Sequence, residues 1–390
     1  MNARHYRGSR GRRTAAIVAG IGLSSLSLLI IAACATSDAR TEPEPDEHVV
    51  IPEADASLEA ALDAPAEGEA PTAPCAAGSL CGAPSPLTIG FVTAIRGRSK
   101  SDVWASGTGG ALMHWNGQTW TALDSGINDT LDSLFVAADE TWGISGTLVL
   151  RRSLDPESVR TMRAPSRPLS SLAVLPGGMA YVSVIGPHNA PPVARPLATL
   201  DFDTRVLTYP PGPVLPWSNQ SPELALRASV LVPDGALWLV GDRGTVVRYP
   251  LLVPDAGGAS PQDAGSMAGP SLGQGTVFPA PTLRDLLAVW GTEEQLWAVG
   301  RGGTIVHFDG AQWHTPESGT TETLNAVFGL SPSDVWAAGD DGTALHFDGT
   351  TWSAVDVGTY RGSLRAIWAA ASDDVWFGGE GGMFHWGTLP

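Results

Sequence analysis

Four histidines recur at one place in four copies of a sequence repeat: His114, His307, His346 and His385. A ring of imidazoles could bind zinc, but this metal needs donor atoms within about 2.1 Å. Equivalent positions in successive repeats lie well apart unless they face a common axis. The spacing therefore favours a repeated packing position, and we predict no metal site and no cofactor.

Three tryptophans follow a tight-turn signal, Asp-Gly or Asn-Gly: Trp120, Trp313 and Trp352. Large aromatic rings stack on sugars in some binding sites, and the same rings pack well between strands. Because the tryptophan recurs together with the turn, packing is the favoured interpretation. The three residues are nevertheless the ligand-binding candidates that this chain offers.

The sequence contains no catalytic motif that we can identify. Gly143-Ile144-Ser145-Gly146 is one residue shorter than the Gly-x-Ser-x-Gly elbow of serine hydrolases. A phosphate-binding loop, a dinucleotide fingerprint, a His-Glu-x-x-His helix and an EF-hand loop are also missing from the sequence. We therefore predict no catalytic residue and a protein that is not an enzyme.

The first cysteine, Cys34, ends a segment that resembles an export signal. Residues 1–14 carry five arginines and no acid, and residues 15–33 are apolar and small. This layout is typical of a secretory signal, although an apolar run of this length could nearly span a bilayer as an uncleaved anchor. Ile31-Ala32-Ala33-Cys34 resembles the lipobox of bacterial lipoproteins. The resemblance implies cleavage before Cys34, lipidation of its thiol and, since no Asp follows, anchoring in the outer membrane.

Residues 34–79 predict a disordered linker after the signal peptide, 1–33. Between Asp38 and Glu69 the chain has eleven acids, one base and no aromatic residue, so this stretch cannot bury enough apolar surface to fold. Cys75 and Cys81 lie at the end of the linker. In an exported protein their spacing favours a small disulfide loop over free thiols or a metal site, because no histidine lies nearby.

The charge of the chain excludes one class of partner. Its 390 residues include 23 Lys+Arg and 40 Asp+Glu, for a net charge of −17, and Lys100 is the only lysine. General nucleic-acid binding needs Lys and Arg clustered on one face, so we predict no nucleic-acid partner. A lipid rather than a charged patch would hold so acidic a protein at a membrane.

A repeat of about 40 residues must position these side chains. Each copy divides into four short apolar runs separated by turns rich in glycine. Four antiparallel strands repeated around an axis make a β-propeller, and a closed ring is favoured over a solenoid because no capping repeats are visible. The landmark aromatic residue of the repeat occurs seven times, at Trp104, Trp142, Tyr181, Trp238, Trp297, Trp336 and Trp376.

We predict an all-β propeller over residues 80–390, with seven four-stranded blades, after a disordered N-terminal tether. Six or eight blades stay open, because the second and third copies match poorly. Loop insertions near 186–222 and 251–276 account for the two long intervals between landmarks. The last copy ends at Pro390 without a fourth strand, so we expect a segment within 80–91 to supply it.

The repeats resemble the Trp-rich repeats of bacterial secreted propellers, including the sialidase-type (Asp-box) and photosystem II assembly-factor-like families. The likeness covers roughly residues 85–390. Asp348-Gly349-Thr350-Thr351-Trp352 is one residue shorter than the Asp box, Asp-x-Gly-x-Thr-Trp. The resemblance implies the fold much more than a function. A sialidase needs an arginine cluster and a Tyr nucleophile, and Arg96 and Arg98 belong to no motif of that kind.

These observations together predict an exported, non-enzymatic, monomeric lipoprotein, anchored in the outer membrane and facing the periplasm or the cell surface. Its propeller would be a scaffold for proteins of the envelope. A carbohydrate-binding propeller that takes polysaccharide is the second hypothesis, and a glycosidase or lyase of sialidase-like fold is the third. Binding usually lies on variable loops of a rigid scaffold, so the two insertions are the expected contact regions.

Overall fold

The computed structural model describes residues 78–86, 90–154, 157–163, 168–175, 180–184, 197–201, 206–208, 225–232, 235–252, 271–279, 281–293 and 295–387. All of them belong to the unit Glu69–Pro390. Cys34, Cys75 and nearly all of the predicted linker lie outside the described residues. Among the residues described, no helix is long and apolar enough to span a membrane.

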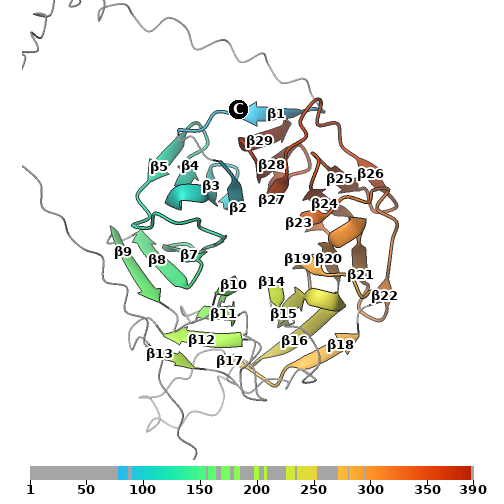
Figure 1. Cartoon of the computed structure of the whole chain (residues 1–390), viewed down its shortest axis with the longest axis horizontal. Helices are drawn as coiled ribbons and strands as arrows, with labels where there is room; N and C mark the ends of the chain where they lie inside the picture. The colour runs from blue at the N-terminus through green and yellow to red at the C-terminus, as the bar shows by residue number, and fades with distance from the viewer. Residues whose placement is uncertain are drawn as a thin grey trace, which may run out of the picture. The chain divides into compact units, whose positions relative to one another are not determined.

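The described strands form six four-stranded sheets and one five-stranded sheet (Figure 1). Grouped by sheet, they are β2 (Val92–Ser99), β3 (Asp102–Gly107), β4 (Leu112–Trp115), β5 (Trp120–Leu123); β6 (Ser133–Val136), β7 (Glu140–Ser145), β8 (Leu148–Leu154), β9 (Glu157–Arg163); β10 (Leu169–Val174), β11 (Ala180–Val184), β12 (Leu197–Asp201), β13 (Val206–Thr208); β14 (Leu226–Val232), β15 (Ala236–Gly241), β16 (Thr245–Leu252), β17 (Ser271–Leu272), β18 (Thr276–Pro279); β19 (Leu286–Gly291), β20 (Leu296–Gly300), β21 (Ile305–Phe308), β22 (Trp313–His314); β23 (Leu324–Ser331), β24 (Asp334–Gly339), β25 (Ala344–Phe347), β26 (Trp352–Ala354); and β27 (Leu364–Ala371), β28 (Asp374–Gly379), β29 (Gly382–Gly387), β1 (Leu80–Ala83). Short 3-10 turns, η2 (Thr108–Gly110), η3 (Asp242–Gly244) and η4 (Arg301–Gly303), join the second and third strands of three sheets.

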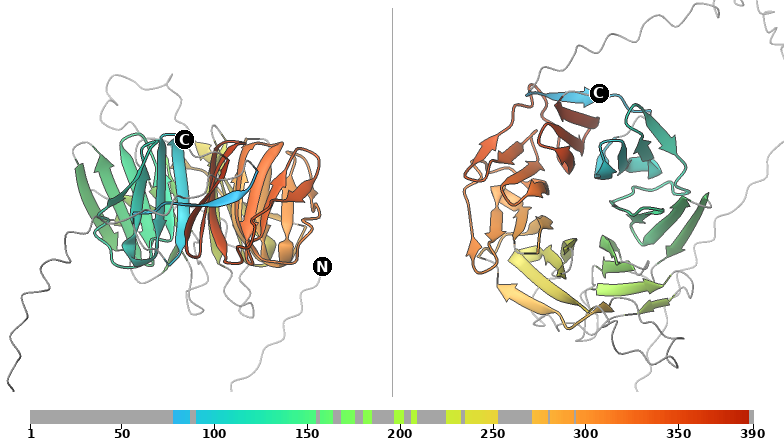
Figure 2. Two further views of the ribbon diagram at one scale, coloured as in Figure 1. Left: turned by 90° about the horizontal axis from the view of Figure 1, so that it is seen from above. Right: turned by 180° about the vertical axis from the view of Figure 1, so that it is seen from behind.

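The first strands of the sheets contact one another in a closed circle. β2 contacts β6, β6 contacts β10, and the series continues through β14, β19, β23 and β27 back to β2. The sheets therefore surround an axis, and two further views show the same ring from its side and its back (Figure 2). The prediction of an all-β propeller is confirmed, and six sheets have the predicted four strands. The sheet that contains β14 has a fifth strand because β17 pairs with the far end of β16.

The ring closes through a strand from the beginning of the propeller. β1 pairs antiparallel with β29, with Leu80 opposite Trp386 and Ala83 opposite Met383. The sheet order is β1-β29-β28-β27, so the expectation that residues within 80–91 supply the missing strand is confirmed. Without β1, the backbone groups on the outer edge of β29 would have no strand partner.

The seven landmark aromatics all lie on the second strand of their sheets, where they pack between neighbouring sheets. Trp336 is 2% exposed. Its ring lies 6.1 Å from the ring of Phe377 in the next sheet. The apolar clusters combine residues of adjacent sheets in the same way. The core of the protein is therefore a series of interfaces between sheets.

The Asx-Gly dipeptides lie in the turns between the third and fourth strands, but each turn has four residues rather than the tight two-residue turn that the dipeptide suggests. Gly117, Gly310 and Gly349 have φ values of +95°, +92° and +93°, which glycine adopts without steric cost. The side chain that precedes each glycine caps the turn. Asp348 Oδ1, for example, accepts hydrogen bonds from the backbone N–H groups of Thr350 and Thr351. These turns fix the register of each outer hairpin.

Strands occupy parts of both expected insertions. The interval 186–222 includes β12 and β13, which complete a four-stranded sheet behind β10 and β11. The interval 251–276 includes the end of β16, all of β17 and the start of β18. These strands are short and do not carry the Trp and Asx-Gly landmarks, which is why the repeat is hard to recognise there.

Candidate functional site

A three-residue pattern, Leu-x-Ala, lies at the start of the first strand of each sheet. In some copies Val replaces the Leu or Ser replaces the Ala. In six sheets the pairing register of this strand with the second strand shifts at x. Such a β-bulge leaves one residue unpaired and redirects its side chain. The x residues are Thr93, Asp132, Ser170, Arg227, Leu287, Asn325 and Arg365, and all of them line one cavity.

This axial cavity has a volume of about 180 Å³ and is lined from all seven first strands or their bulges. Beyond the x residues, its wall is formed mainly by the small and apolar residues of the next two positions. One further side chain, Arg96, reaches it from β2. The charged residues of the wall are Arg96, Arg227, Arg365 and Asp132. Three cations therefore face a single carboxylate in a protein that is acidic overall.

Three polar x residues tie neighbouring sheets together. Thr93 Oγ1 donates a hydrogen bond to the carbonyl of Leu131, and Ser170 Oγ donates to the carbonyl of Leu226. Asn325 Nδ2 donates to the carbonyl of Leu364 at 3.2 Å. Each acceptor immediately precedes x in the next sheet, so these bonds run around the axis. They are structural, and they leave the charged x residues as the chemically distinctive members of the ring.

The guanidinium groups of the three arginines in the cavity have different interaction partners. Arg227 Nε lies 2.5 Å from Asp242 Oδ1, so this guanidinium has a carboxylate partner. The Arg365 guanidinium lies 4.4 Å from the centre of the Phe91 ring. Arg96 Nη1 donates to the carbonyl of Ile95 at 2.8 Å. Its side chain is exposed to solvent.

Desolvation by the surrounding protein shifts the pKa values of Arg96 and Asp132 in opposite directions. Desolvation lowers the pKa of Arg96, although a guanidinium stays charged in proteins. Desolvation also raises the pKa of Asp132, and the nearby Asp129 raises it further, against a hydrogen bond from the Gly146 N–H. That N–H lies 3.2 Å from Asp132 Oδ2. Desolvation therefore disfavours the charged forms of Arg96 and Asp132. No described carboxylate forms an ion pair with Arg96 or Arg365.

The recurring histidines occupy a second repeated arrangement, away from the axial cavity. His114, His346 and His385 each bond through Nε2 to an aspartate at the start of the second strand, at 2.8–2.9 Å. His307 instead bonds to Gln295 and stacks on Trp297 with ring centres 3.9 Å apart. The imidazoles thus pack in separate sheets, as the favoured interpretation proposed. Among the described residues, no group of three or more His, Cys, Asp or Glu could hold a metal ion.

Asp102 shows what this arrangement does to a carboxyl group. Partial burial alone would raise its pKa, but hydrogen bonds from Arg98, His114 and Trp104 outweigh that effect, and the pKa is lowered. Arg98 also donates to the carbonyls of Ala137 and Ala138 in the next sheet. The carboxylate therefore joins an indole, an imidazole and a guanidinium, and it helps to link two sheets.

The three candidate tryptophans lie in sheet interfaces. Trp120 is 8% exposed, and its ring centre is 5.3 Å from that of Trp376. Trp313 and Trp352 are half-buried, and they contact Phe308 and Phe347 of the same sheets at 5.1 and 5.5 Å. Packing accounts for these contacts, and sugar binding by the three rings stays a prediction.

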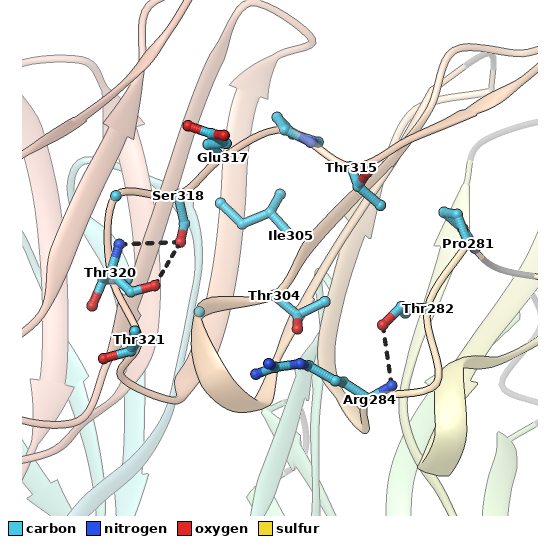
Figure 3. Close-up of a pocket in the computed structure, with 13 residues that line it drawn as sticks. Pro281, Thr282, Arg284, Thr304, Ile305, Thr315, Glu317, Ser318, Thr320 and Thr321 are labelled. Carbon is cyan, nitrogen blue, oxygen red and sulfur yellow. Dashed lines mark hydrogen bonds between the residues drawn. The ribbon is translucent and has the colours of Figure 1, made fainter.

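A wider, open pocket of about 680 Å³ lies between the segment 281–284 and the loop 315–321 (Figure 3). Much of its polar lining is engaged within these two segments. Ser318 Oγ bonds to both the N–H and the carbonyl of Thr320, and Thr282 Oγ1 accepts from the Arg284 N–H at 3.1 Å. Arg284 Nη1 donates to the carbonyl of Gly302. The axial cavity, with its uncompensated cations, is therefore the stronger candidate site.

Cys81 lies on the closing strand β1 and is disulfide-bonded. Its predicted partner, Cys75, lies outside the described residues, so the pairing stays a prediction. The same holds for lipidation of Cys34.

Comparisons with known proteins find likeness in structure only. No family model matches the chain, and no curated protein matches it. A solved structure of YCF48 from Cyanidioschyzon merolae aligns with a TM-score of 0.57 at 16% identity, over 78% of this chain and 97% of that one. YCF48 bound to D1 peptide aligns at 0.51 and 18% identity, over 77% and 93%. The WD40 propeller domain of Doa1 aligns at 0.55 and 11% identity, over 79% and 95%. At such identities the likeness shows the propeller fold alone.

Sequence reasoning missed the cluster of Arg96, Arg227, Arg365 and Asp132. The signal was present in the Leu-x-Ala pattern, since three of the four residues occupy x. It was not used because a strand pattern alone does not show that a bulge turns x toward the axis.

Proposed function

We propose that this protein is a non-enzymatic propeller scaffold that binds another protein on one face of its ring. We call this face of the ring the bulge face. It is defined by the seven x residues and by the turns between the second and third strands. These turns adjoin the x residues, as the contacts of Arg227 with Asp242 and of Asn325 with Asp340 indicate. The five-stranded sheet counts as a blade in this proposal, which makes a seven-bladed ring.

One observation carries the proposal. The repeated Trp, His and Asx-Gly positions serve packing and turns. The x positions that do not bond to the next sheet around the axis carry Asp132, Arg227, Leu287 and Arg365. Chemical variety at equivalent places on a constant scaffold is typical of a binding surface. One similar structure is YCF48 bound to D1 peptide, so a propeller of related shape holds a peptide. That similarity supports protein binding here without naming a partner.

We further propose that the protein is exported and anchored in the outer membrane by lipid on Cys34, with residues 34–79 as a tether. Mass spectrometry of the N-terminal peptide from native cells tests this. A lipidated peptide that starts at Cys34 is the expected result, and an unprocessed Met1 would contradict the proposal.

The binding face is tested by placing a photo-crosslinking amino acid at Asp341, in an exposed turn of the bulge face. The matched control is Thr350, exposed in a hairpin at the opposite end of the same sheet. Cells of the native organism would be irradiated and adducts identified by mass spectrometry. We expect one recurrent protein adduct from position 341 and none from position 350. Equal labelling from both positions, or adducts with polysaccharide alone, would reject the proposal, and the second result would favour the lectin hypothesis.

A further inference from the structure

The axial cavity holds positive charge that the protein does not neutralise. Arg96 and Arg365 line it from β2 and β27, two first strands that contact each other. Within the described part of the chain, neither guanidinium forms an ion pair with a carboxylate, whereas Arg227 across the ring is paired with Asp242. Two uncompensated cations therefore share one side of the cavity.

A bound anion would meet both guanidinium groups without displacing a carboxylate partner. The side chains of Arg96 and Arg365 are exposed to solvent, and the surrounding protein still desolvates Arg96 enough to lower its pKa. Arg96 makes one hydrogen bond, to the carbonyl of Ile95, although a guanidinium has five N–H donors. The remaining donors are available to an acceptor in the cavity.

The size of the cavity limits what that acceptor can be. Its volume of about 180 Å³ is below the about 300–1,000 Å³ of pockets for drug-sized ligands. Guanidinium groups match the oxygen atoms of carboxylates and phosphates in paired hydrogen bonds. The only carboxylate of the wall, Asp132, already accepts a hydrogen bond from Gly146 through Oδ2.

We propose that the axial cavity binds a small oxyanion, a phosphate or a small polycarboxylate, with Arg96 and Arg365 as its principal ligands. Small and apolar residues, together with Asn325, complete the wall around it. The net negative charge of the chain does not favour anions in general, so binding would be confined to this cavity. The inference does not depend on the proposed protein scaffold, because its ligand is a small ion.

The test is isothermal titration of the full chain with sodium phosphate and, separately, sodium citrate, at constant ionic strength set with sodium chloride. We expect saturable binding of at least one anion, and the two arms distinguish a phosphate ligand from a polycarboxylate. Arg96→Gln and Arg365→Gln should each weaken binding by about tenfold or more, the loss of a charge-assisted pair of bonds. Arg163→Gln is the matched control, because Arg163 is exposed on the outermost strand β9.

A second measurement needs no variant and covers the case in which Arg96→Gln fails to fold. Phenylglyoxal modifies accessible guanidinium groups, and mass mapping reports each site. The anion that binds should protect Arg96 and Arg365 but not Arg163. Absence of saturable binding for both anions in the folded wild type would overturn the proposal. Equal loss of affinity in Arg163→Gln, or equal protection at all three sites, would overturn it as well.

Discussion

Replacing Asp334 by alanine should lower the free energy of unfolding by about 2–3 kcal/mol. Asp334 Oδ1 accepts hydrogen bonds from Trp336 Nε1 at 3.1 Å and from His346 Nε2 at 2.8 Å. The indole and imidazole rings stack with centres 4.1 Å apart. One carboxylate thus holds two donors of a sheet interface, and both lose their acceptor in the variant.

The size of the expected loss in unfolding free energy depends on whether each donor can form a hydrogen bond with water in the variant. Trp336 is 2% exposed, so its N–H remains buried without a partner, at a cost of about 1–3 kcal/mol. The His346 side chain is 27% exposed and can turn to solvent, so its lost bond contributes about 0.5–1.5 kcal/mol. Asp334→Asn keeps an acceptor oxygen without the charge, and we expect about half the loss, near ~1 kcal/mol.

Urea unfolding followed by tryptophan fluorescence and far-UV circular dichroism measures these changes. Asp373→Ala is the matched control: the Asp373 side chain is 85% exposed at the corresponding turn of the next sheet, and its loss should change stability by less than about 0.5 kcal/mol. A double-mutant cycle with His346→Ala should show coupling above about 0.5 kcal/mol. Equal stability of Asp334→Ala and Asp373→Ala, or zero coupling, would refute the reasoning.

Three other perturbations probe the turns, the acid response and the ring closure. Gly303→Ala should lower Tm, because φ is +67° and an added Cβ would lie 2.0 Å from the Thr320 carbonyl oxygen. Gly82→Ala is the control, because a Cβ added there would meet nothing within 4 Å. Equal Tm values for the two variants would contradict this prediction. The lowered pKa of Asp102 adds stability above its unfolded-state pKa of about 3.9, and that stability is lost as pH falls through the folded-state pKa. Asp102→Asn should therefore flatten the fall of the urea midpoint below about pH 4, and an unchanged slope would exclude the role of this carboxyl. A chain that starts at Gly90 lacks β1 and leaves the edge of β29 unpaired. It should unfold at a lower urea concentration and, because an unpaired edge promotes aggregation, scatter more light. Stability equal to that of the full chain would show that β1 does not secure the ring.

Much of the propeller could be predicted because short sequence motifs recur in each copy of the repeat. Asn116-Gly117 and Asp348-Gly349 specify hairpins through residues adjacent in the chain. The aromatic residue of each second strand, such as Trp336, marks a buried position. The interval 186–222 gave no such signal, since β12 and β13 carry neither the Trp nor the Asx-Gly turn, and their strands could not be foreseen.

The candidate site is formed by residues that lie far apart in the sequence, so no local sequence pattern could predict it. Arg96 and Arg365 are separated by most of the propeller sequence, and they face one cavity because β1 closes the ring and brings β27 beside β2. Six of the seven x residues also lie at a bulge, which is a property of pairing between two strands rather than of one strand. The amino-acid sequence alone determined most of the strands, the places of their turns and the closing segment, because those follow from neighbouring residues and from a repeat. Only the tertiary structure decided which side chains face the axis and which cations lack a partner, because both depend on how seven sheets meet.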